Sequence, residues 1–176
     1  MIKTKFLFFI LINYLFFNFS IAENIVYADL DSIIKNSDVG KKIIFHFSKK
    51  NENLIEEIKN EEIKIKNKEK SLITQKNILD TEEYSKKVNI LKEEIDQFNN
   101  NNSNKLKQLN KEKDEISKKF MVEVNRIIKE FAEKNNIEMI LSSNHILIGK
   151  SNLDVTNEIL KLVNDKIKKF EIKNNG

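Results

Sequence analysis

The feature that most constrains this chain is a stretch from Lys41 to about Lys134 that contains neither proline nor glycine. The whole sequence of 176 residues has no proline and only three glycines. These are the two residues that helix interiors tolerate least, so helices here are free to run long. Charged residues in the stretch are interleaved with a thin, regular line of Ile, Leu, Val and Phe. The sequence therefore predicts a long helical hairpin projecting from a small body.

Apolar residues in the first half of this stretch follow a seven-residue repeat. They are Ile58, Ile65, Leu72 and Leu79, and the alternate positions of the same seam are the polar residues Glu61, Lys68 and Gln75. A tight coiled coil has apolar residues at both sets of positions. The pattern therefore predicts a half-seam, which is too thin to hold two helices together rigidly along their whole length.

A turn is expected near residues 80–82, which makes 41–134 an antiparallel helical hairpin, or tentacle. Asp80 or Thr81 can cap the second helix, because short polar side chains accept hydrogen bonds from the free N–H groups of a helix start. The two glutamates that follow suit the positive end of that helix. The Asn-rich run at 99–104 has low helix propensity and predicts a soft point or a fray in the returning helix.

The two ends of the mature chain, residues 23–40 and 135–176, are expected to form a small β-rich body. The alternating run at 25–31 predicts a strand. The runs at 137–142 and 145–149 are separated by Ser-Asn and predict a β-hairpin. Together with the long helices, this body makes the expected fold class α+β.

Two helix starts are expected within the body. Ser37 is predicted to cap the first arm helix, with Gly40 in its first turn, and Thr156 is predicted to cap a C-terminal helix. One face of that last helix is apolar, with Val155, Ile159, Leu160, Val163, Ile167 and Phe170.

The body by itself is too small to be stable as a single copy. Domains of this size usually need a disulfide, a metal or a partner, and the chain has no cysteine. Exposed strand edges also favour pairing with another chain. We therefore expect an obligate oligomer built around these apolar residues: Ile25, Val26, Tyr27, Ala28, Leu30, Ile137, Met139, Ile140, Leu141, Ile146, Leu147 and Ile148.

Residues 1–22 have the form of a cleaved export signal. Lys3 and Lys5 precede a Phe-rich apolar run, and small residues at Ser20 and Ala22 match the positions that signal peptidase reads. Cleavage is expected after Ala22, which places the mature protein in the periplasm. The alternative is an uncleaved membrane anchor, although the run is short for a membrane span and is interrupted by asparagines.

No residues of this sequence indicate catalysis, a metal site or a cofactor. A GxxxxGK phosphate loop is absent, and His46 and His145 have no second His or Cys nearby. Removing Lys3 and Lys5 with the signal lowers the formal charge from +4 to +2, so a nucleic-acid partner is not expected. The charge clusters of the arms are interpreted as solvated helix faces.

Three blocks of this chain resemble the Skp/OmpH family of periplasmic chaperones. They are IVYADLDSIIKNSDVGKK, ILDTEEYSKKVNILKEEI and NNIEMILSSNHILIGKSNLDVTNEILKLVN, and the resemblance covers the whole mature chain. It implies a homotrimer whose strands form a central body and whose tentacles enclose unfolded outer-membrane proteins without ATP. Contact with a membrane surface or lipopolysaccharide would also fit such a protein. The chain is less basic than expected for the family and has the additional asparagine run.

The resulting hypothesis is an ATP-independent holdase that prevents aggregation of unfolded outer-membrane proteins. A half-seam leaves apolar side chains free to hold such clients through many weak contacts. The alternatives are a tethering coiled-coil protein anchored to the inner membrane and a prefoldin-like cytosolic chaperone, against which the export signal argues. The residues predicted to bind clients are Leu54, Ile58, Ile65, Leu72, Leu79, Val88, Leu91, Ile95 and Phe98.

Overall fold

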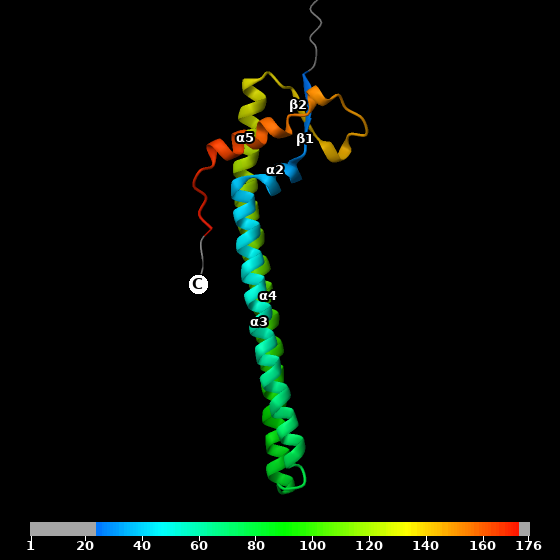
Figure 1. Ribbon diagram of the computed structural model, residues 1–176, viewed down its shortest axis with the longest axis vertical. Helices are drawn as coiled ribbons and strands as arrows, with labels where there is room; N and C mark the ends of the chain where they lie inside the picture. The colour runs from blue at the N-terminus through cyan, green and yellow to red at the C-terminus, as the bar shows by residue number, and fades with distance from the viewer. Residues whose placement is uncertain (1–23, 173–176) are drawn as a thin grey trace, which may run out of the picture.

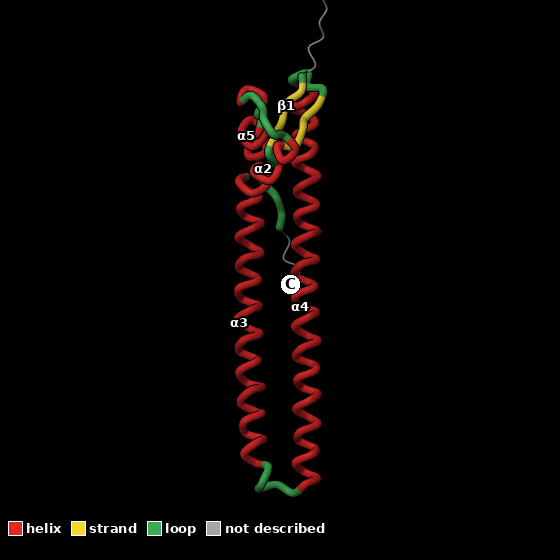
Figure 2. Tube along the Cα trace, turned by 90° about the vertical axis from the view of Figure 1, so that its right-hand side faces the viewer, coloured by secondary structure: helices red, strands yellow, loops and turns green. Residues whose placement is uncertain are grey.

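A computed structural model describes residues 24–172 as a long helical hairpin capped by a small body at one end (Figure 1). The predicted export signal at 1–22 lies outside the described residues. The two arms of the hairpin run side by side from the body to the tip, and a short loop joins them at the far end (Figure 2). Both ends of the described chain belong to the body end of the molecule.

The hairpin consists of α3 (Asp38–Gln75) and α4 (Thr81–Lys134). At about 1.5 Å per residue, the 54 residues of α4 span roughly 80 Å. Asp80 caps α4, as predicted, and its carboxylate accepts a hydrogen bond of 2.8 Å from the Glu83 N–H. The fray predicted at 99–104 is wrong, because α4 is unbroken through this run. Packing against α3 outweighs the low helix propensity of asparagine there.

A two-stranded sheet connects the start of the described chain to the end of the hairpin. Strand β1 (Ile25–Ala28) pairs in parallel with β2 (Met139–Ser142). The predicted strand at 25–31 is too long: Asp29 instead caps a short helix, α2 (Leu30–Asn36), by accepting a 2.8 Å hydrogen bond from the Ser32 N–H. A parallel pair needs a long connection, and here the whole hairpin supplies it.

The predicted β-hairpin at 137–149 is wrong. After β2 the chain forms two short 3₁₀ turns, η1 (Ser143–His145) and η2 (Ser151–Leu153), and the segment between them pairs with no strand among the described residues. Leu147 and Ile148 are 97% and 90% exposed at the outer edge of the body. The β-type sequence of this segment thus has no partner within the same chain.

The body is closed by α5 (Thr156–Lys166), which crosses the root of the hairpin (Figure 1). Thr156 is not the cap that was predicted, since Val155 precedes the helix without a side-chain bond. The Thr156 hydroxyl instead accepts a 2.8 Å hydrogen bond from the Asp29 N–H and so joins α5 to α2. The predicted apolar face of α5 is confirmed, because Ile159 and Val163 are fully buried.

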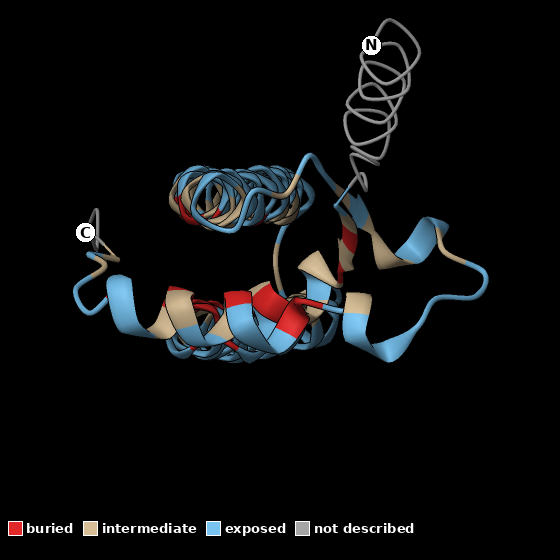
Figure 3. Cartoon of the chain, turned by 90° about the horizontal axis from the view of Figure 1, so that it is seen from above, coloured by how far each residue is buried: buried red, intermediate tan, exposed pale blue. Residues whose placement is uncertain are grey.

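All of the fully buried apolar residues lie in the body and the hairpin root. Figure 3, which looks along the hairpin from the body, shows buried segments in β1 and α5. Ser37 caps α3 as predicted and is itself fully buried, with its hydroxyl accepting a 3.1 Å bond from the Gly40 N–H. Phe120 of α4 is 1% exposed and contacts the ring of Phe170 edge-on at 5.5 Å. The core therefore holds the root firmly, while the remaining length of the arms lies outside it.

Candidate functional site

The arms beyond the root contain no fully buried residue between positions 48 and 101. The nine residues predicted to bind clients all lie in this part of the hairpin, and each is half-buried. Their helical spacing places them along the side of each arm that faces the other arm. Apolar burial thus continues along the arms but is never complete, as the half-seam predicted.

Polar residues bridge the arms at regular intervals in a single antiparallel register. Lys68 and Gln75, which are polar seam positions, contact Glu94 at 2.6 Å and Lys87 at 3.2 Å. Nearer the root, Lys105 meets Glu57 at 2.7 Å and Lys50 meets Glu112 at 2.9 Å. Such partly exposed pairs contribute little stability, typically about 0–1 kcal/mol each. Their main effect is to fix the alignment of the two arms, and they add little to the free energy that holds the arms together.

Hydrogen bonds between exposed side chains shift the pKa values of several charged groups on the arms. The bond from Lys66 lowers the pKa of Glu62, and the same bond raises the pKa of Lys66. The bond to Glu57 raises the pKa of Lys105. A carboxyl with a lowered pKa contributes stability above its ordinary value of about 4.5 and loses it as the pH falls further. Both shifts favour the charged forms of Glu62 and Lys66.

A second set of large apolar residues on the hairpin is exposed to solvent and was not predicted. Ile73 near the tip is 68% exposed, and Ile78 in the turn is 78% exposed. Their positions fall outside the seven-residue repeat of Ile58, Ile65, Leu72 and Leu79. The large apolar side chains exposed on the arms and turn are Ile44, Phe45, Ile55, Ile63, Ile73, Ile78, Ile90, Leu106 and Val122.

Asn102 interrupts the seam with a buried amide that has no partner. The residue is 7% exposed, and neither its amide nitrogen nor its amide oxygen forms a hydrogen bond within the described chain. A buried polar group without a partner costs about 1–3 kcal/mol. The buried amide of Asn102 is therefore a weak point in the packing between the root and the outer arms, although α4 is regular there.

Replacing Asn102 by leucine is expected to stabilise the hairpin by about 1–3 kcal/mol, because the substitution removes the unsatisfied amide from the seam. Urea unfolding followed by circular dichroism measures the change. Asn101→Leu on the exposed face of the same turn is the control and should change stability by less than about 0.5 kcal/mol. A loss of stability in Asn102→Leu would show that the amide has a partner in the assembled protein.

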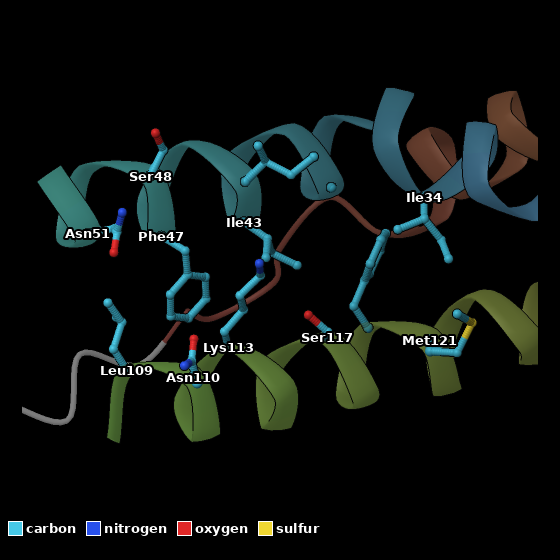
Figure 4. Close-up of a pocket in the computed structure, with 13 residues that line it drawn as sticks. Ile34, Ile43, Phe47, Ser48, Asn51, Leu109, Asn110, Lys113, Ser117 and Met121 are labelled. Carbon is cyan, nitrogen blue, oxygen red and sulfur yellow. The ribbon is translucent and has the colours of Figure 1, made fainter. Parts of the chain in front are cut away.

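A cavity of about 480 Å³ opens where the hairpin joins the body (Figure 4). We call it the root pocket. Its walls are mostly apolar side chains of α3 and α4, including Ile43, Phe47, Leu109 and Phe120, and Ile34 of α2 closes one end. Lys113 extends from α4 toward α3 within it (Figure 4). No local sequence pattern predicts this pocket, because its lining comes from two segments, 34–51 and 109–121, that are distant in the chain.

The residues predicted to form the oligomeric body differ in how far they are buried. Val26 and Ala28 are buried in the core of their own chain. Five others are half-buried along or beside the sheet: Ile25, Tyr27, Leu30, Ile137 and Ile140. Ile146 is half-buried in the outer loop, while Met139, Leu141, Leu147 and Ile148 are exposed. The exposed members leave an apolar surface on the body.

The histidines and carboxylates of the described residues are dispersed along the fold. Within residues 24–172, no three His, Cys, Asp or Glu side chains gather as metal ligands would. His46 packs edge-on against Phe47 at 5.1 Å, and His145 is exposed in η1. No helix within the same range has the length and apolar character needed to cross a bilayer.

The fold is a long, thinly packed helical hairpin on a small body made of a two-stranded sheet and short helices. The comparison with known families makes this assignment specific: residues 24–163 match the family described as Outer membrane protein (OmpH-like). The match covers most of the chain, and the protein therefore belongs to the OmpH-like family.

A solved structure shares this fold. It is the crystal structure of a candidate outer membrane chaperone (OmpH-like) from Caulobacter crescentus CB15, with a TM-score of 0.78. The similarity covers 84% of this chain and 88% of that one, at 14% sequence identity. At such low identity the likeness extends to the fold alone. No curated protein matched the sequence.

Proposed function

We propose that the mature protein is an ATP-independent periplasmic holdase that binds unfolded outer-membrane proteins between its helical arms. The observation that carries this proposal is the incomplete burial of every apolar seam residue beyond the root. The family assignment and the fold shared with an OmpH-like chaperone candidate support it. No catalytic role is proposed.

The arms have the surface chemistry that unfolded β-barrel chains need. Such chains alternate apolar and polar residues and are insoluble in water before they insert into a membrane. The half-buried seam and the exposed isoleucines provide many weak apolar contacts between charged side chains. Promiscuous binders hold varied partners through surfaces of this kind. Release needs no fuel, because folding of the client into the membrane removes it by mass action.

We further propose that the working form is a homotrimer assembled through the body. The sheet has only two strands, and the exposed apolar residues Met139, Leu141, Leu147 and Ile148 lie on or beside it. Unpaired strand edges and exposed apolar patches favour association with further copies. Three copies is the number that the family resemblance implies. The arms of such a trimer would surround a shared cavity.

The proposed location is the periplasm, after export by the signal at 1–22 and cleavage after Ala22. The arms carry the lysine pairs Lys49-Lys50, Lys86-Lys87 and Lys118-Lys119. We propose that these pairs can contact the phosphates of a membrane surface or of lipopolysaccharide. The mature charge of +2 gives such contact a minor part in client capture. The first residue of the exported protein decides between cleavage, which leaves Glu23, and anchoring, which leaves Met1.

Light scattering tests the holdase activity. A β-barrel outer-membrane protein diluted from urea aggregates, and a stoichiometric amount of trimer is expected to suppress the scattering without ATP. An equal mass of an unrelated helical protein serves as the control. If scattering rises as fast with the chain as without it, the holdase proposal is wrong.

A further inference from the structure

The root pocket combines an apolar interior with a single positive charge. The apolar side chains of Phe47, Leu109 and Phe120 line its depth, and its volume of about 480 Å³ lies in the range of about 300–1,000 Å³ typical of small-molecule sites. Lys113 is the only charged residue of the lining. It takes part in none of the ion pairs formed within residues 24–172. The pocket therefore has a cation without a carboxylate.

Neutral hydrogen-bonding side chains lie with this cation at the solvent-exposed rim of the pocket. The side chains of Asn51 and Asn110 and the hydroxyls of Ser48 and Ser117 also line the pocket, on both arms (Figure 4). All four can donate hydrogen bonds, and Lys113 adds a charge-assisted donor. A ligand that satisfies these groups has an anionic head that accepts several hydrogen bonds and an apolar part that fills the depth.

We propose that the root pocket binds a single-chain anionic amphiphile, a free fatty acid, with its carboxylate at Lys113 and its alkyl chain between α3 and α4. An alkyl chain suits the space between Ile43, Phe47 and Leu109, where water would meet few polar partners. The carboxylate offers up to four acceptor sites to the donors of the rim. The proposal goes beyond the holdase function, because the pocket lies at the root and the proposed client surface lies along the outer arms.

Isothermal titration calorimetry of the mature protein with dodecanoate, below its micelle concentration, tests this site. Saturable binding with one site per chain is expected. Lys113→Gln should weaken it about tenfold, since a hydrogen bond to a charged group is lost. Ser117→Phe, which places a ring in the cavity, should abolish it. Leu109→Trp enlarges a side chain that points from α4 toward Phe47 (Figure 4), and it replaces Ser117→Phe if that variant fails to fold by circular dichroism.

Matched variants separate the pocket from general surface binding. Lys107→Gln and Ser103→Phe alter exposed positions of α4 outside the lining and should bind dodecanoate as the unaltered protein does. Dodecyltrimethylammonium, with a similar chain and the opposite charge, should bind at least tenfold more weakly. Equal binding of the two amphiphiles, absence of saturable dodecanoate binding, or equal losses in Lys113→Gln and Lys107→Gln would each overturn the proposal. Light scattering of a client is a separate readout, so either proposal can fail alone.

Discussion

Replacing Ile65, Leu72 and Leu91 together by serine is expected to weaken client binding about a hundredfold while leaving the trimer intact. A half-buried Ile or Leu contributes on the order of 1 kcal/mol of apolar contact, and the three together correspond to about a factor of one hundred. The three residues lie far from the body that is proposed to form the trimer. Because the chain has no tryptophan, client tryptophan fluorescence measures the affinity without background.

A second triple variant distinguishes direct contact from loss of arm structure. Ile55, Ile73 and Ile90 are 48–68% exposed, so serine at these positions should leave arm helicity unchanged. Client affinity should still fall, because these side chains are already free to contact a client. If the seam variant loses the trimer, those seam residues are purely structural. If neither triple variant changes affinity, the arms are not the client surface.

Gly40→Ala is expected to destabilise the protein by about 3 kcal/mol, against the usual preference of helices for alanine. A Cβ at this position would lie 1.6 Å from the backbone oxygen of Ile34 and 2.8 Å from the Ser37 hydroxyl oxygen. The backbone cannot move out of the way as a flexible side chain would. Overpacking of this kind costs typically about 1–3 kcal/mol, and the displaced Ser37 cap adds about 1 kcal/mol.

Urea unfolding of Gly40→Ala measures this change, with Lys41→Ala at the next, exposed position as the control. Helix propensity alone favours alanine over glycine by about 1 kcal/mol. An increase in stability would therefore show that α2 does not lie against α3 as described. The expected loss would place the joint between α2 and α3 among the features that hold the hairpin to the body.

Local signals in the sequence predicted the hairpin and most of its caps. The absence of proline and glycine allowed long helices, and the short polar side chains of Ser37 and Asp80 indicated where they begin. The heptad spacing located the seam because helical periodicity is a property of neighbouring residues. Of the soft point or fray expected at 99–104, the fray is wrong, since packing of a long helix outweighs the propensity of a few residues.

The body was harder to predict because its structure depends on distant contacts. Asp29 ends β1 by capping α2, where its carboxylate accepts a hydrogen bond from the Ser32 N–H. The short polar side chain of Asp29 is the only local sign of this helix start. The run from Ile146 to Ile148 has strand-forming residues but no partner within the described chain. β-propensity expresses packing against neighbouring strands, so the residues alone could not decide its conformation.

The candidate functional surfaces also differ in whether local sequence signals predict them. The half-buried seam followed from periodicity, whereas the exposed isoleucines and the root pocket depend on how α3 and α4 pack. Ile34, Phe47 and Lys113 are distant in sequence and meet only after the hairpin closes on the body.

Native mass measurement tests the central claim most directly. The mature protein should have the mass of three chains that begin at Glu23, and addition of an unfolded outer-membrane protein should give one species of three chains with one client. A control with the same client already folded in detergent should give no complex. A single-chain species, or a trimer that takes up no unfolded client, would contradict the account.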